Sequence, residues 1–162
     1  MIRSLGSLCL LSCLTLSAFA DTFKLPESKP VISFVLPDSW NPTATAAGLE
    51  AVSVDNEIYL AVEFVDEDSI KDVFESDRSF LKDQGVTIEE KQQAEPDTMI
   101  NKMPVVHKNF NGTDKEGPCD VSLSIIEVAQ GQALVIMYWG SPNAAEKHKD
   151  SLVKIMNSMT KI

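Results

Sequence analysis

Hydrophobic residues follow two different spacings near the end of the chain. Residues 132–140 read QALVIMYWG, with large apolar side chains at both odd and even positions. Because successive side chains of a strand point to opposite faces, this segment predicts a central strand that is covered on both faces. From residue 142 to 159, apolar residues recur every three or four positions, which predicts an amphipathic helix packed back over the sheet. We expect Ser141 to cap this helix and Pro142 to occupy its first turn.

Shorter apolar patterns predict the remaining elements. They indicate strands at residues 31–36, 49–54, 57–65, 86–94, 99–110 and 121–128. A second helix is expected at residues 70–84, because apolar residues there share one helical face and Gly85 can end it. This order of elements predicts an α+β domain: an antiparallel β-sheet flanked by helices, with the C-terminal helix packed on the sheet.

Three segments lack such patterns. Residues 21–29 are polar, and we expect them to be loosely held. Residues 43–48, TATAAG, have neither bulk nor periodicity and are expected to form a mobile loop. Residues 111–118 begin with the turn dipeptide Asn-Gly, which predicts a polar loop between two strands.

The first twenty residues have the pattern of a secretory signal peptide. Arg3 supplies a positive charge, residues 5–16 form an apolar core, and Ala18-Phe19-Ala20 matches a small-x-small cleavage site. Cleavage near Ala20 would leave residues 21–162 as a single domain, periplasmic or secreted.

A lipoprotein is the alternative to a cleaved, soluble product. Leu10-Leu11-Ser12-Cys13 loosely resembles a lipobox, which would place an acyl anchor on Cys13. No later segment is long and apolar enough to predict a transmembrane segment.

Acidic residues dominate the charge of the chain. The formal net charge is −10, from 14 Lys and Arg against 24 Asp and Glu. Removal of residues 1–20 takes away Arg3 and no acidic residue, so the net charge of the mature chain becomes −11. Nucleic acids and anionic membrane surfaces require basic patches, so this charge disfavours both as partners and permits a basic protein or a cation.

Three short motifs, together with the order of elements, resemble the PsbP-like superfamily. They are Phe34-Val35-Leu36-Pro37-Asp38-Ser39-Trp40, Ile100-Asn101-Lys102-Met103, and Gly140-Ser141-Pro142 before a helix that ends Ile155-Met156-Asn157-Ser158-Met159. This superfamily includes extrinsic proteins of photosystem II, a Ran-binding nuclear-import factor and small bacterial envelope proteins. The signal peptide and the length make the chain most similar to the bacterial envelope (DcrB-like) branch.

The resemblance implies an antiparallel sheet between helices and a non-enzymatic accessory or protein-binding role in the cell envelope. Another envelope protein is the partner it implies. Lys102 departs from the family pattern, in which a glycine often precedes the methionine. This difference bears on the conformation of the turn that contains Lys102.

The sequence predicts no enzyme and no cofactor. It contains no phosphate-binding loop, dinucleotide-binding glycine motif, nucleophile elbow, H-E-x-x-H or C-x-x-C. Cys119 is the only cysteine after residue 20, so it is either buried and inert or available for an intermolecular bond, and as a nucleophile it would need His107 or His148 beside it. His148 falls on the apolar stripe of the last helix, where we expect it to bond to backbone. A hydrolase of unrecognised type stays open.

Copper binding is the alternative function. Met99, Met103 and His107 are spaced four apart, and thioether with imidazole is a ligand set that favours copper. On a strand, however, residues four apart lie roughly 13 Å from each other, so one ion would need help from other elements. The methionines can equally fill gaps in the core, and we expect no metal site.

Two loop regions are the candidate contact surfaces for a partner. One contains Trp40 and residues 44–48; the other contains Asn111 and Lys115. Trp40 can instead be a packing residue at the end of the sheet. Asn111-Gly112-Thr113 is also a glycosylation sequon, which has meaning only in a eukaryotic source.

Overall fold

The computed structural model describes residues 20–89, 93–94 and 98–162. The predicted signal peptide, with the alternative lipidation site at Cys13, lies outside these residues except for Ala20. Within the described part of the chain, no helix is long and apolar enough to cross a membrane.

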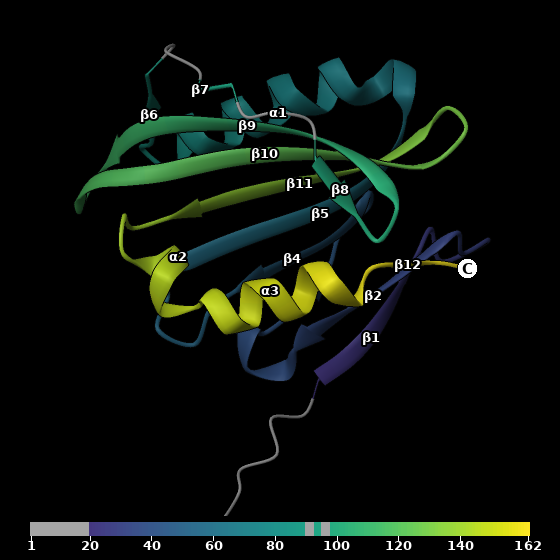
Figure 1. Ribbon diagram of the computed structural model, residues 1–162. Helices are drawn as coiled ribbons and strands as arrows, with labels where there is room; N and C mark the ends of the chain where they lie inside the picture. Colours follow the sequence, from purple (N-terminus) through teal and green to yellow (C-terminus); the bar gives the residue numbers. More distant parts are fainter. Residues whose placement is uncertain (1–19, 90–92, 95–97) are drawn as a thin grey trace, which may run out of the picture.

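Within the described residues, the domain has two antiparallel sheets, three α-helices and two short 3-10 helices (Figure 1). The large sheet has the strand order β3-β4-β5-β11-β10-β9-β6, with β7 and β8 also paired to β9, and the small sheet has the order β1-β2-β12. The strands are β1 Ala20–Leu25, β2 Ile32–Pro37, β3 Thr43–Ala44, β4 Gly48–Val52, β5 Ile58–Asp66, β6 Thr87–Ile88, β7 Gln93–Ala94, β8 Thr98–Ile100, β9 Met103–Asp114, β10 Gly117–Ala129, β11 Gln132–Gly140 and β12 Thr160–Lys161. The helices are α1 Ile70–Asp83, α2 Ala144–Lys147 and α3 Lys149–Ser158.

Strand β11 lies in the middle of the large sheet, as its apolar sequence predicts. It pairs with β5 on one side and β10 on the other. Val135 and Ile136, which point to opposite faces, are only 1% and 4% exposed. Burial of both faces is the reason that this strand has no polar alternation.

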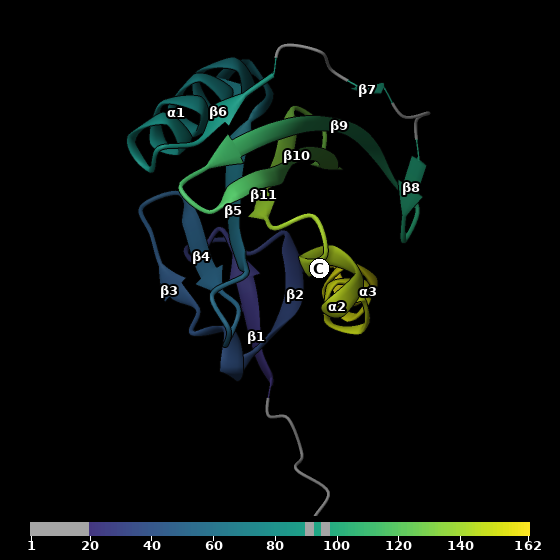
Figure 2. The ribbon, with the colours of Figure 1, turned by 90° about the vertical axis from the view of Figure 1, so that its left-hand side faces the viewer.

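Each face of the large sheet is covered by a different helix, and Figure 2 shows α1 and α3 on opposite sides. On one face Leu81 of α1 packs in a cluster with Val135 and Met137. On the other, Ile155 of α3 packs with Ile136 and with the small sheet. The predicted α+β fold is confirmed, and Gly85 ends α1 with a φ of 85°, as expected.

The expectation that residues 21–29 are loosely held is wrong for the first part of that segment. Residues 20–25 form β1, which pairs with β2 along its whole length. Leu25 is buried, and the rings of Phe23 and Phe34 stack with their centroids 6.0 Å apart. The alternation of Phe23 and Leu25 with polar residues is a strand pattern that the overall polarity of the segment concealed.

The expected mobile loop at residues 43–48 is also wrong, because Thr43 and Ala44 form β3 and pair with Glu50 and Leu49 of β4. The polar loop expected at residues 111–118 is a tight hairpin instead. Strand β9 runs to Asp114 and β10 begins at Gly117, and the Asp114 carboxylate accepts the backbone N–H groups of Glu116 and Gly117. Main-chain hydrogen bonds therefore form both hairpins without bulky side chains.

The strand expected at residues 99–110 is divided in two by a turn at Asn101 and Lys102. Both residues have positive φ values, 49° and 69°. Lys102 thus adopts the left-handed conformation in which a glycine is favoured. Residues 90–92 of the strand expected at 86–94 lie outside the described residues. The described part of that segment contains β6 and β7, which pair separately with β9.

The C-terminal helix differs from the prediction at its start and in its middle. It begins at Ala144, and neither Ser141 nor Pro142 is part of it. Ser141 contributes its carbonyl, which accepts the N–H of Ala144, and no side chain caps the helix. At His148 the backbone leaves helical geometry and separates α2 from α3.

Candidate functional site

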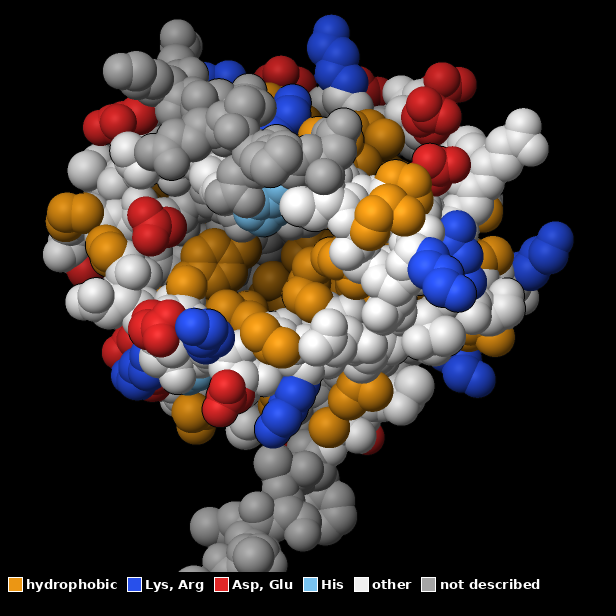
Figure 3. Space-filling model, viewed as in Figure 1, with side chains coloured by type: hydrophobic (Ala, Val, Ile, Leu, Met, Phe, Trp, Pro, Cys, Tyr) orange, Lys and Arg blue, Asp and Glu red, His pale blue; other side chains and the backbone are white. Residues whose placement is uncertain are grey.

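A groove opens on the face of the large sheet that α3 covers, and we call it the front groove. It has a volume of about 440 Å³. Its floor is formed by Leu60, Ile136 and Tyr138, and one wall by Leu152 and Met156 of α3. Figure 3 shows this hollow with apolar side chains across its floor.

Polar side chains form the opposite wall of the front groove. Adjacent strands β9 and β10 place His107 beside Ser124, Asn109 beside Ser122, and Asn111 beside Asp120. Paired residues of neighbouring strands share a face, so these six side chains form a polar ladder along one edge of the groove. The front groove therefore has an apolar floor and one polar wall.

Ser124 and Tyr138, which line the front groove, both have buried hydroxyl groups. Ser124 Oγ and His107 Nδ1 are 2.6 Å apart and share a hydrogen bond. The hydroxyl of Tyr138 lies beside Gly140 and has no hydrogen-bond partner among the residues that the structure describes. Burial raises the pKa of Tyr138 to about 12, with a smaller contribution from Asp120, so the phenol stays neutral and can donate.

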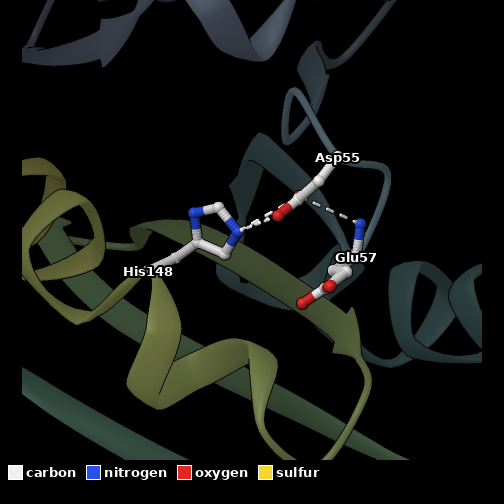
Figure 4. Close-up of side chains that lie close together, drawn as sticks. All are labelled: Asp55, Glu57 and His148. Carbon is white, nitrogen blue, oxygen red and sulfur yellow. Dashed lines mark hydrogen bonds and ion pairs between the residues drawn. The ribbon is translucent and has the colours of Figure 1, made fainter.

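A second polar cluster ties the turn before β5 to α2 and α3 (Figure 4). His148 Nε2 lies 2.8 Å from an oxygen of Asp55, and the ammonium of Lys147 lies 2.8 Å from Asp55 and 2.7 Å from Glu57. Lys147 and then Ser53 hold the pKa of the Asp55 carboxyl well below its ordinary value. The expectation that His148 bonds to backbone is wrong, because its partner is a side chain.

Asp55, Glu57 and His148 have ligand atoms within 4.8 Å of one another, close enough to hold a metal ion. The ammonium of Lys147 already lies between the two carboxylates and balances part of their charge. The edge of the His148 ring also packs on Trp40, with ring centroids 5.7 Å apart. These contacts explain the cluster as a link between the helices, the sheet turn and the core.

The partner-contact residues expected from the sequence fall in different places. Trp40 is fully packed in the core, in agreement with the packing interpretation rather than the contact interpretation. Asn111 is exposed and lines the front groove, whereas Lys115, at the tip of the β9–β10 hairpin, lines a separate hollow beside Trp139. The two hairpin residues do not form one surface.

The three residues of the copper alternative do not converge. Met99 pairs with Pro104, and Ile100 pairs with Met103, so Met99 and Met103 lie on opposite faces of the β8–β9 hairpin. Met99 is 62% exposed and Met103 is 1% exposed. His107 shares its hydrogen bond with Ser124.

Cys119 is a buried, protonated thiol. Burial raises its pKa to about 11, and the negative charge of Asp114 contributes to the shift. A thiol that stays protonated at neutral pH is a poor nucleophile. Its burial agrees with the inert role among the two left open by the sequence.

Sequence reasoning missed the polar ladder of the front groove. The signal was present in β9 and β10, where every second residue from His107 to Asn111 and from Asp120 to Ser124 is polar. That alternation is also typical of any strand with one solvated face. The pairing register of the two strands is what shows that these residues share a face with the core.

No protein-family model matches the sequence, and no curated protein matches it. Similar solved structures exist. A solution structure of cyanobacterial PsbP (CyanoP) from Synechocystis sp. PCC 6803 is 9% identical, with a TM-score of 0.59 over 98% of this chain and 99% of that one. A crystal structure of LpqN, described as involved in cell envelope biogenesis of Mycobacterium tuberculosis, is 12% identical, with a TM-score of 0.51 over 88% and 91% of the two chains. The chain therefore has the PsbP-like fold that its motifs suggested.

Proposed function

We propose that this protein is an exported, non-enzymatic accessory module of the cell envelope that binds another envelope protein. Support comes from the N-terminal export pattern and from the fold shared with PsbP and with LpqN, a protein involved in cell envelope biogenesis. The burial and raised pKa of Cys119 fit a module without nucleophilic chemistry.

The proposed binding role rests mainly on the front groove. Its apolar floor can receive side chains of a partner, and its polar ladder offers hydrogen-bond donors and acceptors along two strands. An extended peptide segment fits both features of the groove. Its alternate side chains can pack on the apolar floor, and its unpaired backbone groups can hydrogen-bond to the polar ladder. The negative net charge favours a partner segment with basic residues.

Two adjacent residues of α3 provide a matched test. Leu152 lines the groove, whereas Val153 points away from it and is 49% exposed. We expect wild-type protein to capture one stoichiometric partner from an envelope extract of its own host. Leu152→Glu should lose that partner because it places a charge on the apolar wall, and Val153→Glu should keep it. Circular dichroism would verify that both variants are folded.

Two outcomes contradict the proposal. One is the absence of any saturable, stoichiometric partner for the wild-type protein. The other is equal capture by the Leu152→Glu and Val153→Glu variants, which would place the contact surface outside the front groove.

A further inference from the structure

A second hollow lies on the opposite face of the large sheet, beneath α1, and we call it the outer pocket. Figure 2 shows α1 on this face, beside β6 at the edge of the sheet. The pocket has a volume of about 280 Å³. Its walls are mainly apolar and include Phe74, Leu81, Ile88, Phe110, Leu123 and Met137.

Asp77 is a buried acid in the wall of the outer pocket. It lies on α1, is 9% exposed, and one of its carboxyl oxygens, Oδ2, has no hydrogen-bond partner within the described part of the chain. Burial raises the pKa of Asp77 to about 7, and the negative charge of Glu63 on β5 adds to the shift. A buried carboxyl with an unmet hydrogen bond is unfavourable for folding, so a ligand that supplies a donor there would remove a penalty.

The surroundings of Asp77 are acidic on one side and apolar on the other. A recess of about 190 Å³ next to the outer pocket is also lined by Asp77, together with Glu50 and Glu63. Arg78 and Glu89 are the other charged residues of the outer pocket. The potential at Asp77 therefore favours a cation, while the walls of the outer pocket favour a hydrocarbon.

A bare metal ion does not fit this arrangement. Asp77, Glu63 and Glu50 do not bring three carboxyl oxygens within 4.8 Å of one another in the described part of the chain. Glu50 also already accepts the hydroxyl of Tyr59 at 2.8 Å. A cation that meets one carboxyl and carries its own apolar surface matches the site better.

We infer that the outer pocket binds a small organic amine, with its protonated amino group hydrogen-bonded to Asp77 Oδ2 and its apolar body held between α1 and the sheet. The volume suits a ligand of modest size, since a cavity of about 150 Å³ already holds benzene. This site is on the other face of the sheet from the front groove and does not depend on the proposed partner.

Linear amines of increasing length provide the probe. The mature protein, purified from its own host, would be titrated with n-butylamine, n-hexylamine and n-octylamine by isothermal titration calorimetry. n-Hexanol and n-hexanoate serve as ligands of matched length. We expect saturable binding of n-hexylamine, at least tenfold weaker binding of n-hexanol, and none of n-hexanoate. Two-dimensional NMR should place the shifted resonances in α1, β10 and β11 and leave α3 unchanged.

A pair of variants on α1 separates the specific contact from general attraction of a cation by an acidic protein. Asp77→Asn removes the charge in the pocket, whereas Asp83→Asn removes an exposed charge on the same helix. We expect Asp77→Asn to weaken n-hexylamine binding at least tenfold and Asp83→Asn to leave it within twofold. Equal binding of n-hexylamine and n-hexanol, equal effects of the two variants, or the absence of saturable amine binding would each overturn the inference.

Discussion

Asp77 interrupts the apolar stripe that α1 turns toward the sheet, and its environment differs from that of the other acids on this helix. Asp72 and Asp83 are exposed, whereas Asp77 packs above the sheet beside Glu63. An acid at the centre of an apolar stripe is unfavourable for folding when it is ionised. Its ionisation should therefore be visible in the pH dependence of stability.

The substitution Asp77→Asn should stabilise the protein above neutral pH. In the folded state the pKa of Asp77 is about 7, against 3.8 for the ordinary carboxyl. Between these two pH values the native protein holds a proton that the unfolded chain releases, so stability falls as pH rises through this window. We expect the variant to be more stable than wild type at pH 8, by as much as about 4 kcal/mol, and close to it at pH 4. Urea unfolding at both pH values measures the difference.

The control for this prediction is Asp83→Asn, which changes the net charge equally on the same helix. Its stability should stay within about 0.5 kcal/mol of the wild type at both pH values, because Asp83 is an exposed surface position. A constant difference between Asp77→Asn and wild type from pH 4 to pH 8 would show that Asp77 is ionised throughout, contrary to its raised pKa.

The hydroxyl of Tyr138 provides a second test at this scale. It has no partner in the described structure, whereas the hydroxyl of Tyr59 donates to Glu50. Removing an unpaired buried hydroxyl recovers its desolvation penalty, and removing a bonded one loses a hydrogen bond. We expect Tyr138→Phe to raise the free energy of unfolding by up to about 1 kcal/mol and Tyr59→Phe to lower it by about 1 kcal/mol.

A Tyr138→Phe variant that is as unstable as Tyr59→Phe in urea unfolding would indicate that the hydroxyl is bonded in the free protein.

At the level of elements, the turn between β8 and β9 links the large sheet to the end of α3. Asn101 lies at this turn, and its side-chain amide donates to the carbonyls of Asn157 and Met159 at 2.9 and 2.7 Å. These carbonyls belong to the last turn of α3 and the residue that follows it, where intrahelical donors are missing. Two of the three motifs noted in the sequence, residues 100–103 and the helix end at 155–159, are therefore in contact.

Two adjacent substitutions separate the roles of this turn. Asn101→Ala leaves the backbone of the turn in place but removes both side-chain hydrogen bonds. We therefore expect it to lower the free energy of unfolding by about 1 to 2 kcal/mol. Lys102→Gly should raise it by up to about 1 kcal/mol, because glycine adopts the observed φ of 69° without the steric penalty of a Cβ. Thermal unfolding of both variants tests the pair. If Lys102→Gly is less stable than wild type, contacts of the lysine side chain stabilise the fold by more than its positive φ destabilises it.

Element types could be predicted from the sequence where burial alone decides them. The continuous apolar run of β11 is compatible only with a strand buried on both faces, and the periodic stripe of α1 only with an amphipathic helix. Both elements were predicted correctly. Errors arose where main-chain hydrogen bonds decide the structure: β1 is mostly polar, β3 has two small residues, and the turn at Asn101 relies on contacts with residues more than fifty positions away. Periodicity carries no information on such distant pairings.

The candidate sites were harder to predict than the fold for the same reason. Tyr138 and Ser124 lie in strands whose patterns only indicate which face they occupy, and their meeting with α3 depends on the tertiary arrangement. The sequence analysis did not single out Asp77, because its buried position appears only once α1 packs on the sheet. The sequence left packing and contact open for Trp40, and the structure buries its side chain.

At the level of the whole molecule, the large sheet separates two cores and two hollows. One core lies between the sheet and α1 and contains the outer pocket; the other lies between the sheet, α3 and the small sheet and contains the front groove. The polar ladder on β9 and β10 explains why α3 leaves that part of the sheet uncovered, because an apolar helix face would bury its hydrogen-bonding groups without partners.

The two ends of the described chain meet on one strand. Strand β2 pairs with β1 on one side and with β12 on the other, and the N–H of Ile162 donates to the carbonyl of Val31 at 3.0 Å. Met159, just before β12, is fully buried. The last three residues therefore cover an edge of β2 that would otherwise present unpaired backbone groups.

Removal of residues 160–162 should destabilise the domain and expose this edge. We expect a loss of about 1 to 3 kcal/mol in urea unfolding, from the few main-chain hydrogen bonds that join β12 to β2. We also expect concentration-dependent association in size-exclusion chromatography, because an open strand edge pairs with another chain. The double variant Thr160→Ala, Lys161→Ala is the matched control: it keeps the backbone pairing and should change the free energy of unfolding by no more than about 0.5 kcal/mol. A truncated protein that stays monomeric and as stable as the control would show that β2 is sufficiently held by β1 and α3 alone.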